Sequence, residues 1–351
     1  MGCLCSHPEE PAAQEDEAPK VYSWDKRDKV DPKDFTIANL KDETVGRVPG
    51  TVNGQQFIIQ DCENCNIFIF DHSATITIDD CVNCRIFLGP IKGSVFIRDC
   101  KDCKCMFACQ QFRTRDCKKI DCFLSCATQP IIEASTGMKF GCFQYFYPEL
   151  ESQFASAGLS VFNNNWSNIH DFTPVPGETS WSLLSEDIKV EDCLPNPTTE
   201  QFQGVQISTQ SQDSVIPITR GSRRKTSDES CLVVFFSSDA DNRDLARRFL
   251  QKMGQEAAGC ALMQTKEISM TGDDVRRVFG SSAELELFVQ AAQKGPVIGI
   301  EYNGTSSVSV CKEHVQAVVG SAAAVVYTSD SPAKAATDVD NFYNFADMQM
   351  M

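Results

Sequence analysis

The sequence predicts a right-handed parallel β-helix followed by a ferredoxin-like α+β domain. Two observations support this fold class. A unit that begins Asp-Cys recurs at Asp61, Asp80 and Asp99, with short runs of β-forming residues between the copies, and repetition at a fixed period without a helical pattern is typical of a solenoid of stacked strands. After residue 230 the repeat is absent, and apolar runs of strand length alternate with apolar positions at helical spacing.

Length, composition and charge limit the class of protein. With 351 residues, of which 42% are hydrophobic, the chain is long enough for two or three domains with apolar cores. Its net charge of −16 argues against nucleic acid as a partner. No apolar run has the length of a membrane span, and the start lacks the apolar stretch of a secretory signal. The 18 cysteines are therefore expected to be mostly reduced thiols of a cytosolic protein.

The chain begins Met-Gly-Cys-Leu-Cys-Ser, which matches the pattern for N-myristoylation. Gly2 is the acceptor, Ser6 stands in the recognition position, and Cys3 can carry a palmitoyl chain, whereas acylation of Cys5 is left open. One myristoyl chain binds a membrane only weakly, and the residues that follow are acidic, so the palmitoyl chain is needed as the second anchor. Residues 1–21 are therefore predicted to be a flexible, lipidated segment.

Residues 22–200 are predicted to form the β-helix. Asp61-Cys-Glu-Asn-Cys recurs as Asp80-Cys-Val-Asn-Cys and Asp99-Cys-Lys-Asp-Cys, and a shortened copy begins at Asp116. Coils about 4.8 Å apart would stack one cysteine of each copy into an inward-facing ladder, formed by Cys62, Cys81, Cys100 and Cys117. Buried free cysteine suits such a ladder because it behaves as a small apolar residue.

A zinc site is the competing interpretation of these cysteines. The first two pairs have the spacing of a zinc ribbon, in Cys62, Cys65, Cys81 and Cys84. A third pair follows at the same interval, however, and the repeated unit also includes Asp and Asn. A coil period explains all of these positions, whereas zinc explains only the first two pairs. We therefore predict structural cysteines and no metal.

The stretch 110–117 is the candidate functional site. If it is extended, Phe112 and Thr114 point to one face of the strand, and Arg113 and Arg115 point to the other. Two fixed arginines near amides suit recognition of an oxyanion or a phosphate, because the guanidinium group is planar and always charged. The same pair on an exposed strand can also serve solubility alone, and the spacing does not decide between the two interpretations.

Three segments resemble the β-helix domain of the tubulin cofactor C family, namely residues 43–57, the Asp-Cys-x-x-Cys coils, and Cys109-Gln-Gln-Phe-Arg113. The lipidation signal and the C-terminal half extend the resemblance across nearly the whole chain, to the retinitis pigmentosa 2 branch of that family. The resemblance implies a GTPase-activating protein for an Arf-like small GTPase in its GTP state. Arg113 is then the expected arginine finger, and Gln110 is the second member of the catalytic element.

The same resemblance implies a location and a cofactor assignment. GTP and Mg would belong to the partner GTPase, and no cofactor of the chain's own is expected. The chain would be anchored through its acyl groups at the cytoplasmic face of the plasma membrane, with the ciliary base as a candidate location. There it would take part in the trafficking of lipidated cargo.

The resemblance also suggests supporting residues near Arg113. Strict alternation along a strand puts Gln111, not Gln110, on the face of Arg113, so a bend between residues 110 and 113 is needed to bring Gln110 to the partner. Glu133 lies about one coil later and is expected to orient Arg113 by an ion pair. Gln111 and Arg115 are expected to make further contacts with the partner.

An Asn-rich segment, which includes His170 and Phe172, is expected to form the last coil. Phe172 is either a hydrophobic anchor for the partner or an aromatic ring that covers the end of the core. His170 is expected to be structural, because no second histidine is nearby.

Residues 201–229 are predicted to be a linker and residues 230–351 to be the ferredoxin-like domain, with a βαββαβ order. This domain resembles nucleoside diphosphate kinase through Gln264-Thr-Lys-Glu-Ile-Ser and Gly295-Pro-Val-Ile-Gly-Ile-Glu. Its histidine, His314, does not stand in the Asn-x-x-His context that the phosphate acceptor of that kinase requires. No phosphotransfer is therefore expected, and the domain is predicted to serve in interaction.

Two other functions remain open at this stage. The chain could be a non-catalytic effector or scaffold that binds the GTP-loaded GTPase and releases lipidated cargo, or it could assist tubulin folding, as cofactor C does. Whether it counts as an enzyme is also open, since an activator completes the active site of its partner and has no complete site of its own. The cognate GTPase, the ligand of the second domain and the oligomeric state do not follow from the sequence.

Overall fold

The computed structural model describes residues 31–280, 282–320 and 323–349. Gly2, Cys3, Cys5 and the rest of the predicted lipidated segment lie outside the described residues. The described residues from Phe35 onward form one compact unit. Among the described helices, none combines the length and the apolar character needed to cross a bilayer.

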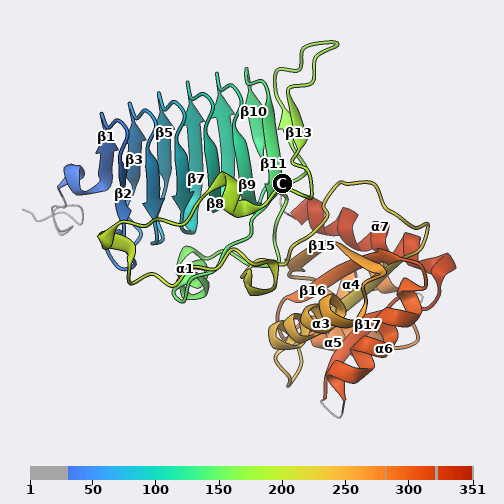
Figure 1. The fold of residues 1–351 in the computed structure, drawn as a ribbon. Helices are drawn as coiled ribbons and strands as arrows, with labels where there is room; N and C mark the ends of the chain where they lie inside the picture. Colours follow the sequence, from blue (N-terminus) through green and yellow to red (C-terminus); the bar gives the residue numbers. More distant parts are fainter. Residues whose placement is uncertain (1–30, 281, 321–322, 350–351) are drawn as a thin grey trace, which may run out of the picture. The chain divides into compact units, whose positions relative to one another are not determined.

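The first part of this unit is a parallel β-helix, as predicted. Its strands form one sheet of 13 strands within the described residues, and neighbouring strands of this sheet run parallel. They stack coil upon coil from blue to green in Figure 1. The strands are β1 (Thr36–Ala38), β2 (Thr44–Arg47), β3 (Phe57–Gln60), β4 (Asn66–Ile69), β5 (Ile76–Asp79), β6 (Arg85–Leu88), β7 (Ile91–Arg98), β8 (Lys104–Arg115), β9 (Asp121–Cys126), β10 (Ile131–Glu133), β11 (Met138–Cys142), β12 (His170–Asp171) and β13 (Trp181–Leu183).

The acidic and amide positions of the repeat are set by the backbone. The aspartates that open the copies have left-handed backbone angles, with φ of 51°, 51°, 53° and 55° at Asp61, Asp80, Asp99 and Asp116. Asn64 and Asn83 have φ of 56° and 53°. Asp and Asn tolerate this conformation better than most other residues with a side chain. The coils that begin at Asp61, Asp80 and Asp99 therefore each turn at two such residues, which explains why the repeated unit contains more than cysteine.

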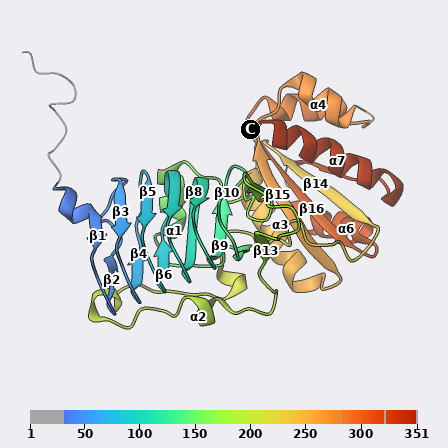
Figure 2. The ribbon, with the colours of Figure 1, turned by 90° about the horizontal axis from the view of Figure 1, so that it is seen from above.

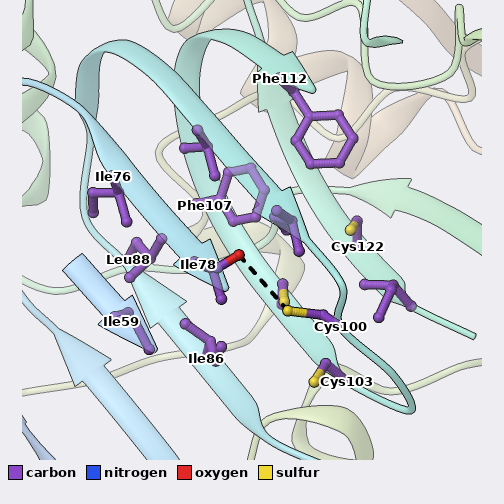
Figure 3. Close-up of a cluster of buried hydrophobic side chains, with 14 of the residues drawn as sticks. Ile59, Ile76, Ile78, Ile86, Leu88, Cys100, Cys103, Phe107, Phe112 and Cys122 are labelled. Carbon is purple, nitrogen blue, oxygen red and sulfur yellow. Dashed lines mark hydrogen bonds between the residues drawn. The ribbon is translucent and has the colours of Figure 1, made fainter. Parts of the chain in front are cut away.

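The cysteines between these turns face inward, which confirms the predicted ladder. The ladder residues Cys62, Cys81, Cys100 and Cys117 are all buried, and each is a free thiol. Their sulfurs pack against isoleucine, leucine and phenylalanine, as Figure 3 shows around Cys100 and Cys103. Within the described residues, no group of three or more His, Cys, Asp or Glu side chains is arranged to hold a metal ion.

A second layer covers one side of the β-helix. It contains α1 (Leu150–Ala157), α2 (Val190–Cys193) and the short 3-10 turns η3 (Glu200–Phe202) and η4 (Ser211–Asp213), while η2 (Pro32–Phe35) precedes β1. Phe202 lies 5.7 Å from Phe68 and 5.6 Å from Phe70, ring centroid to ring centroid. Ile216 is buried as well. The segment 201–229, expected as a linker, thus includes residues that pack firmly on the folded parts.

The second part of the unit is an antiparallel sheet of four strands in the order β15-β16-β14-β17. This is the ferredoxin-like order, and it confirms the predicted fold of residues 230–351. The elements are β14 (Ser230–Phe236), α3 (Asn242–Glu256), β15 (Cys260–Ile268), α4 (Gly272–Phe279), α5 (Leu285–Ala292), β16 (Val297–Gly304), α6 (Ser307–Val319), β17 (Val325–Thr328) and α7 (Pro332–Gln349).

Helices cover both faces of this sheet, and β14 is therefore buried on both sides. Val233 and Phe235 pack with residues of α3 and α6, whereas Leu232, Val234 and Phe236 pack with residues of α4, α5 and α7. Figure 2 shows α7 lying along the sheet. Gly299 of β16 allows this close approach, since a Cβ at this position would lie only 2.0 Å from the ring of Phe342 on α7.

The loop at the end of the β-helix is bonded to β15. Asn163 forms two hydrogen bonds with the backbone of Glu267, at 2.7 and 2.9 Å. The Thr265 hydroxyl donates to the carbonyl of Phe162 at 2.7 Å. Because the loop leads directly into β12, these bonds fix the strand that carries His170 and precedes Phe172.

Candidate functional site

The candidate stretch lies on β8, a strand that passes through a corner of the β-helix. Its first half, as far as Cys109, pairs with β9, and its second half, from Arg113, pairs with β10. In the second half Phe112 and Thr114 are buried with 1% and 3% exposure, whereas Arg113 and Arg115 are exposed. The predicted alternation of this stretch is therefore confirmed.

The strand β8 changes direction near Gln110, at a corner of the β-helix, but this bend does not bring Gln110 to the face of Arg113. The change of pairing partner falls between Cys109 and Arg113, and the pairing of β8 with β7 also shifts register there. The carbonyl of Gln110 accepts hydrogen bonds from the backbone N–H of Thr128 at 3.1 Å and from its hydroxyl at 2.9 Å. The Gln110 residue is half-buried and Gln111 is exposed, so Gln111 is the amide that shares the open face with Arg113.

Arg113 stands between two apolar neighbours on adjacent strands. Phe96 of β7 and Ile131 of β10 are in register with it on either side. The Phe96 side chain is unusually open for a phenylalanine, with 37% exposure. Apolar side chains can support the aliphatic stem of an arginine while its charged head stays in water.

The charge of Arg113 is not neutralised by a neighbouring acid. Arg98, on the same face, donates two hydrogen bonds to Asp79, and Arg115 lies 3.3 Å from the carboxylate of Asp116. Within the described part of the chain, no carboxylate forms an ion pair with Arg113. Of Arg98, Arg113 and Arg115, Arg113 is the one whose guanidinium has no acidic partner among the described residues.

Glu133 is not positioned as expected. It is in register with Arg115, and the residue opposite Arg113 is Ile131. No ion pair joins Glu133 to Arg113 in the described structure, so the orienting contact predicted from sequence is absent from it. Glu133 nevertheless lies on the same exposed face, one row away from Arg113.

Phe172 follows β12 at the end of this face and is 66% exposed. Its backbone N–H donates to the carbonyl of Ile132 at 2.8 Å, and its ring lies 6.0 Å from that of His170 in an edge-on arrangement. A ring this exposed does not cover the end of the core, which removes the second interpretation of Phe172. His170 is exposed too, and it is therefore a surface residue where a structural one was expected.

An open groove of about 320 Å³ adjoins Arg113. Its walls come from β8, β10, the loop before β12 and the end of α7. The lining residues are Gln111, Phe112, Arg113, Thr128, Gln129, Ile131, Asn165, Asn168 and Asp347. One cation, one acid and several amides thus surround a space that is open to a partner.

Asp347 is the lining residue that sequence reasoning missed. It belongs to α7 and is far from the β-helix in the sequence, so no local pattern connects it with Arg113. Its carboxylate lies 3.5 Å from the ammonium of Lys266, which also contacts Asn165 at 2.5 Å. Burial lowers the pKa of the Lys266 ammonium, and Asp347 acts in the opposite direction.

Comparison with known proteins places this geometry in a family. The family model described as Tubulin binding cofactor C matches residues 54–172. Protein XRP2 of Gallus gallus is 61% identical to the chain over 342 residues, which cover 97% of the chain and 94% of that protein. The chain belongs to the XRP2 family. The human XRP2 protein is 58% identical over 355 residues and covers 100% of the chain and 99% of its own length.

The XRP2 family shares only part of its length with tubulin-specific chaperone C. The human chaperone is 28% identical to the chain over 154 residues, which are 43% of the chain and 44% of the chaperone. The range of the family model includes Gln110, Arg113, Glu133 and Phe172, and it ends before Asp347. The predicted resemblance to the retinitis pigmentosa 2 branch is therefore confirmed.

Proposed function

We propose that the chain activates GTP hydrolysis by an Arf-like small GTPase, with Arg113 as an arginine finger supplied in trans. The observation that carries this proposal is the free guanidinium of Arg113, displayed beside a groove while Arg98 and Arg115 are paired with acids. A guanidinium placed on the charge that develops as the γ-phosphate leaves accelerates hydrolysis by roughly 10³ to 10⁵.

The scaffold suits this role because little ordering remains to be done on docking. Arg113 is flanked by parallel strands on both sides, and its neighbours Phe112 and Thr114 are anchored in the core. A side chain held on rigid elements loses less conformational entropy when it binds. GTP and Mg would come with the partner, and the chain would contribute side chains alone.

The other residues of the face have supporting roles in this proposal. Gln111, which shares the exposed face with Arg113, would contact the GTPase near its nucleotide. Gln110, half-buried at the corner of β8, would hold the strand in place through the bonds of its carbonyl to Thr128. Phe172 would be the apolar anchor, since an exposed aromatic at the edge of a rigid face is a typical hot-spot residue. Glu133 and Arg115, one row away from Arg113, would contact the partner and not the phosphate.

Lipidation would place this activity at a membrane. The acceptor Gly2 and the thiol of Cys3 fit dual acylation, which gives stable anchoring where one chain does not. The proposed location is the cytoplasmic face of the plasma membrane, including the ciliary base. An activator there would end the GTP state of a GTPase that carries or releases lipidated cargo.

A tubulin-directed role is the second candidate, and the similarity to tubulin-specific chaperone C favours it. Single-turnover GTP hydrolysis separates the possibilities. The full chain is added to a panel of GTP-loaded Arf-like proteins and, in parallel, to tubulin. Acceleration of one Arf-like protein that Arg113→Ala abolishes supports the proposal. Acceleration with tubulin alone supports the second candidate, and binding without acceleration indicates an effector or scaffold.

A further inference from the structure

We infer that Asp347 is a specificity-determining residue, which pairs with a cationic side chain of the partner beside the nucleotide site. This inference rests on the proposed function, because it concerns the partner that Arg113 serves. It assigns to the second domain a direct part in recognition, for which no residue could be predicted from the sequence.

The first observation is that the groove has walls from both parts of the chain. Arg113 and Gln111 come from the β-helix, whereas Asp347 comes from α7. The Asp347 side chain is 52% exposed, so one of its edges is open to a partner. A GTPase that places its phosphates at Arg113 would therefore bring neighbouring surface against Asp347.

The second observation is a buried cation behind the groove. The side chain of Lys266 is only 3% exposed, and its ammonium contacts the side-chain oxygen of Asn165 and the carboxylate of Asp347. Both of these residues line the groove. A buried charge is costly unless it is paired, so Lys266 holds Asn165 and Asp347 in fixed positions. The contact to Lys266 is made by one carboxylate oxygen, Oδ1, at 3.5 Å, and the side chain stays 52% exposed. The carboxylate is thus held in a defined place, and its second oxygen is the one offered to a partner.

Charge complementarity then identifies the chemistry of the contact. The groove is lined by one guanidinium, one carboxylate and several side-chain amides. The matching surface has a phosphate opposite Arg113 and an arginine or lysine opposite Asp347. Complementary charges at the edge of an interface affect partner choice and association rate more than they affect the chemical step.

Asp347 lies outside the part of the chain that the family model covers. The stretch matched by the family model ends at residue 172 and includes Arg113, whereas Asp347 lies beyond it. Tubulin-specific chaperone C matches 43% of the chain. An activator with the same β-helix and no α7 would keep the finger and lack this carboxylate. The carboxylate of Asp347 is therefore a feature that this chain has and that an activator with the β-helix alone would lack.

The test measures stimulated hydrolysis by the full chain as a function of its concentration, with the GTP-loaded Arf-like protein that responds best. Asp347→Asn keeps the shape and removes the charge, and it is expected to raise the half-saturating concentration about 2- to 5-fold with an unchanged maximal rate. Asp347→Lys is expected to raise it further. The salt dependence of association should weaken in both variants, because a charge pair has been removed.

Asp340→Asn is the matched control, since Asp340 is an exposed acid on the same helix and does not line the groove. It is expected to behave like the unchanged chain. If Asp347→Asn leaves the half-saturating concentration and the salt dependence unchanged, the inference is wrong. A lower maximal rate at unchanged half-saturation would also overturn it, because Asp347 would then act through Arg113. An unchanged rate in Arg113→Ala would instead refute the proposed function itself.

Discussion

Arg98 donates two hydrogen bonds to Asp79, at 2.7 Å from Nε and 2.6 Å from Nη2. The two residues stand opposite each other in adjacent strands, so the register of the coils itself creates this pair. Arg113 is on the same face one coil later, next to Phe96 and Ile131, and no acid is opposite it. The register therefore neutralises one arginine and leaves the next one available to an external anion.

Arg113→Ala in the full chain is expected to reduce GTPase stimulation by roughly 10³-fold or more, because the leaving phosphate loses its stabilising cation. Binding to the partner loaded with a non-hydrolysable GTP analogue should stay close to that of the unchanged chain. Arg113→Lys should fail as well, since a point charge does not reproduce the planar fork. Single-turnover hydrolysis and a binding titration measure the two effects separately.

Arg98→Ala is the control for this experiment, since Arg98 lies on the same face but is already paired. The Arg98→Ala variant should stimulate GTP hydrolysis by the partner nearly as well as the unchanged chain does. If Arg113→Ala instead lost binding in proportion to activity, Arg113 would be a docking residue and not a finger.

Phe172→Ala is expected to raise the half-saturating concentration of the chain about 10-fold, with little change in the maximal rate. The reason is that the ring is 66% exposed and can be buried only by a partner. Val175→Ala is a matched control, because Val175 is also an exposed apolar residue, at 49%, and follows Phe172 in the same segment. Thermal unfolding should be unaffected. A clear loss of thermal stability in Phe172→Ala would show that the ring covers the core after all.

The sequence predicted those features that depend on neighbouring residues. Alternation along one strand was enough to turn Phe112 inward and Arg113 outward, and a coil period was enough to stack the cysteines. The position of Glu133 could not be predicted from the sequence, because the coils differ in length. The residue in register with Arg113 in the next coil is Ile131. The presence of Asp347 at the groove could not be predicted either, for a different reason. Its place beside Arg113 depends on how α7 packs, and nothing near Asp347 in the sequence indicates this.

Asp80→Val is expected to destabilise the β-helix by about 1–2 kcal/mol, because a β-branched residue is strained at the φ of 51° that this position adopts. Asp80→Gly is the matched variant, and it should cost less because glycine adopts positive φ freely. Chemical denaturation of both variants measures the difference. Equal stability of the two variants would mean that the side chain, and not the backbone angle, explains the repeat.

Treatment of the folded chain with a chelator is expected to leave its thermal unfolding temperature unchanged, because the cysteines are predicted to be structural. The cysteines of the Cys-x-x-Cys units are free thiols that donate to backbone carbonyls and not to a metal site. The Cys100 thiol donates to the carbonyl of Arg98 at 3.1 Å, and the Cys103 thiol to the carbonyl of Lys101 at 3.3 Å. Dialysis against a strong chelator and elemental analysis of the folded chain provide the measurement. Cys100→Ala should cost about 1–2 kcal/mol through the small cavity that it leaves. Stoichiometric zinc, with unfolding on chelation, would restore the zinc interpretation of the ladder.

The full chain is expected to show no nucleoside diphosphate kinase activity. His314 lies on α6 with 7% exposure, and its Nδ1 donates to the carbonyl of Val310 at 2.8 Å. The remaining nitrogen, Nε2, is turned toward Glu256 at 3.6 Å. A phosphate-accepting histidine must reach the γ-phosphate of a bound nucleotide. The His314 ring is packed against α3, and the Glu256 carboxylate beside it would repel the phosphate.

The assay offers ATP and a nucleoside diphosphate to the chain and follows phosphate transfer and acid-labile phosphohistidine. His314→Gln is the control, because it keeps a polar side chain of similar length and removes the nucleophile. Turnover above background that this substitution abolishes would show that the ring can leave its buried position. In that case the second domain would have a chemistry of its own, and its part in partner recognition through Asp347 would have to be tested separately from that chemistry.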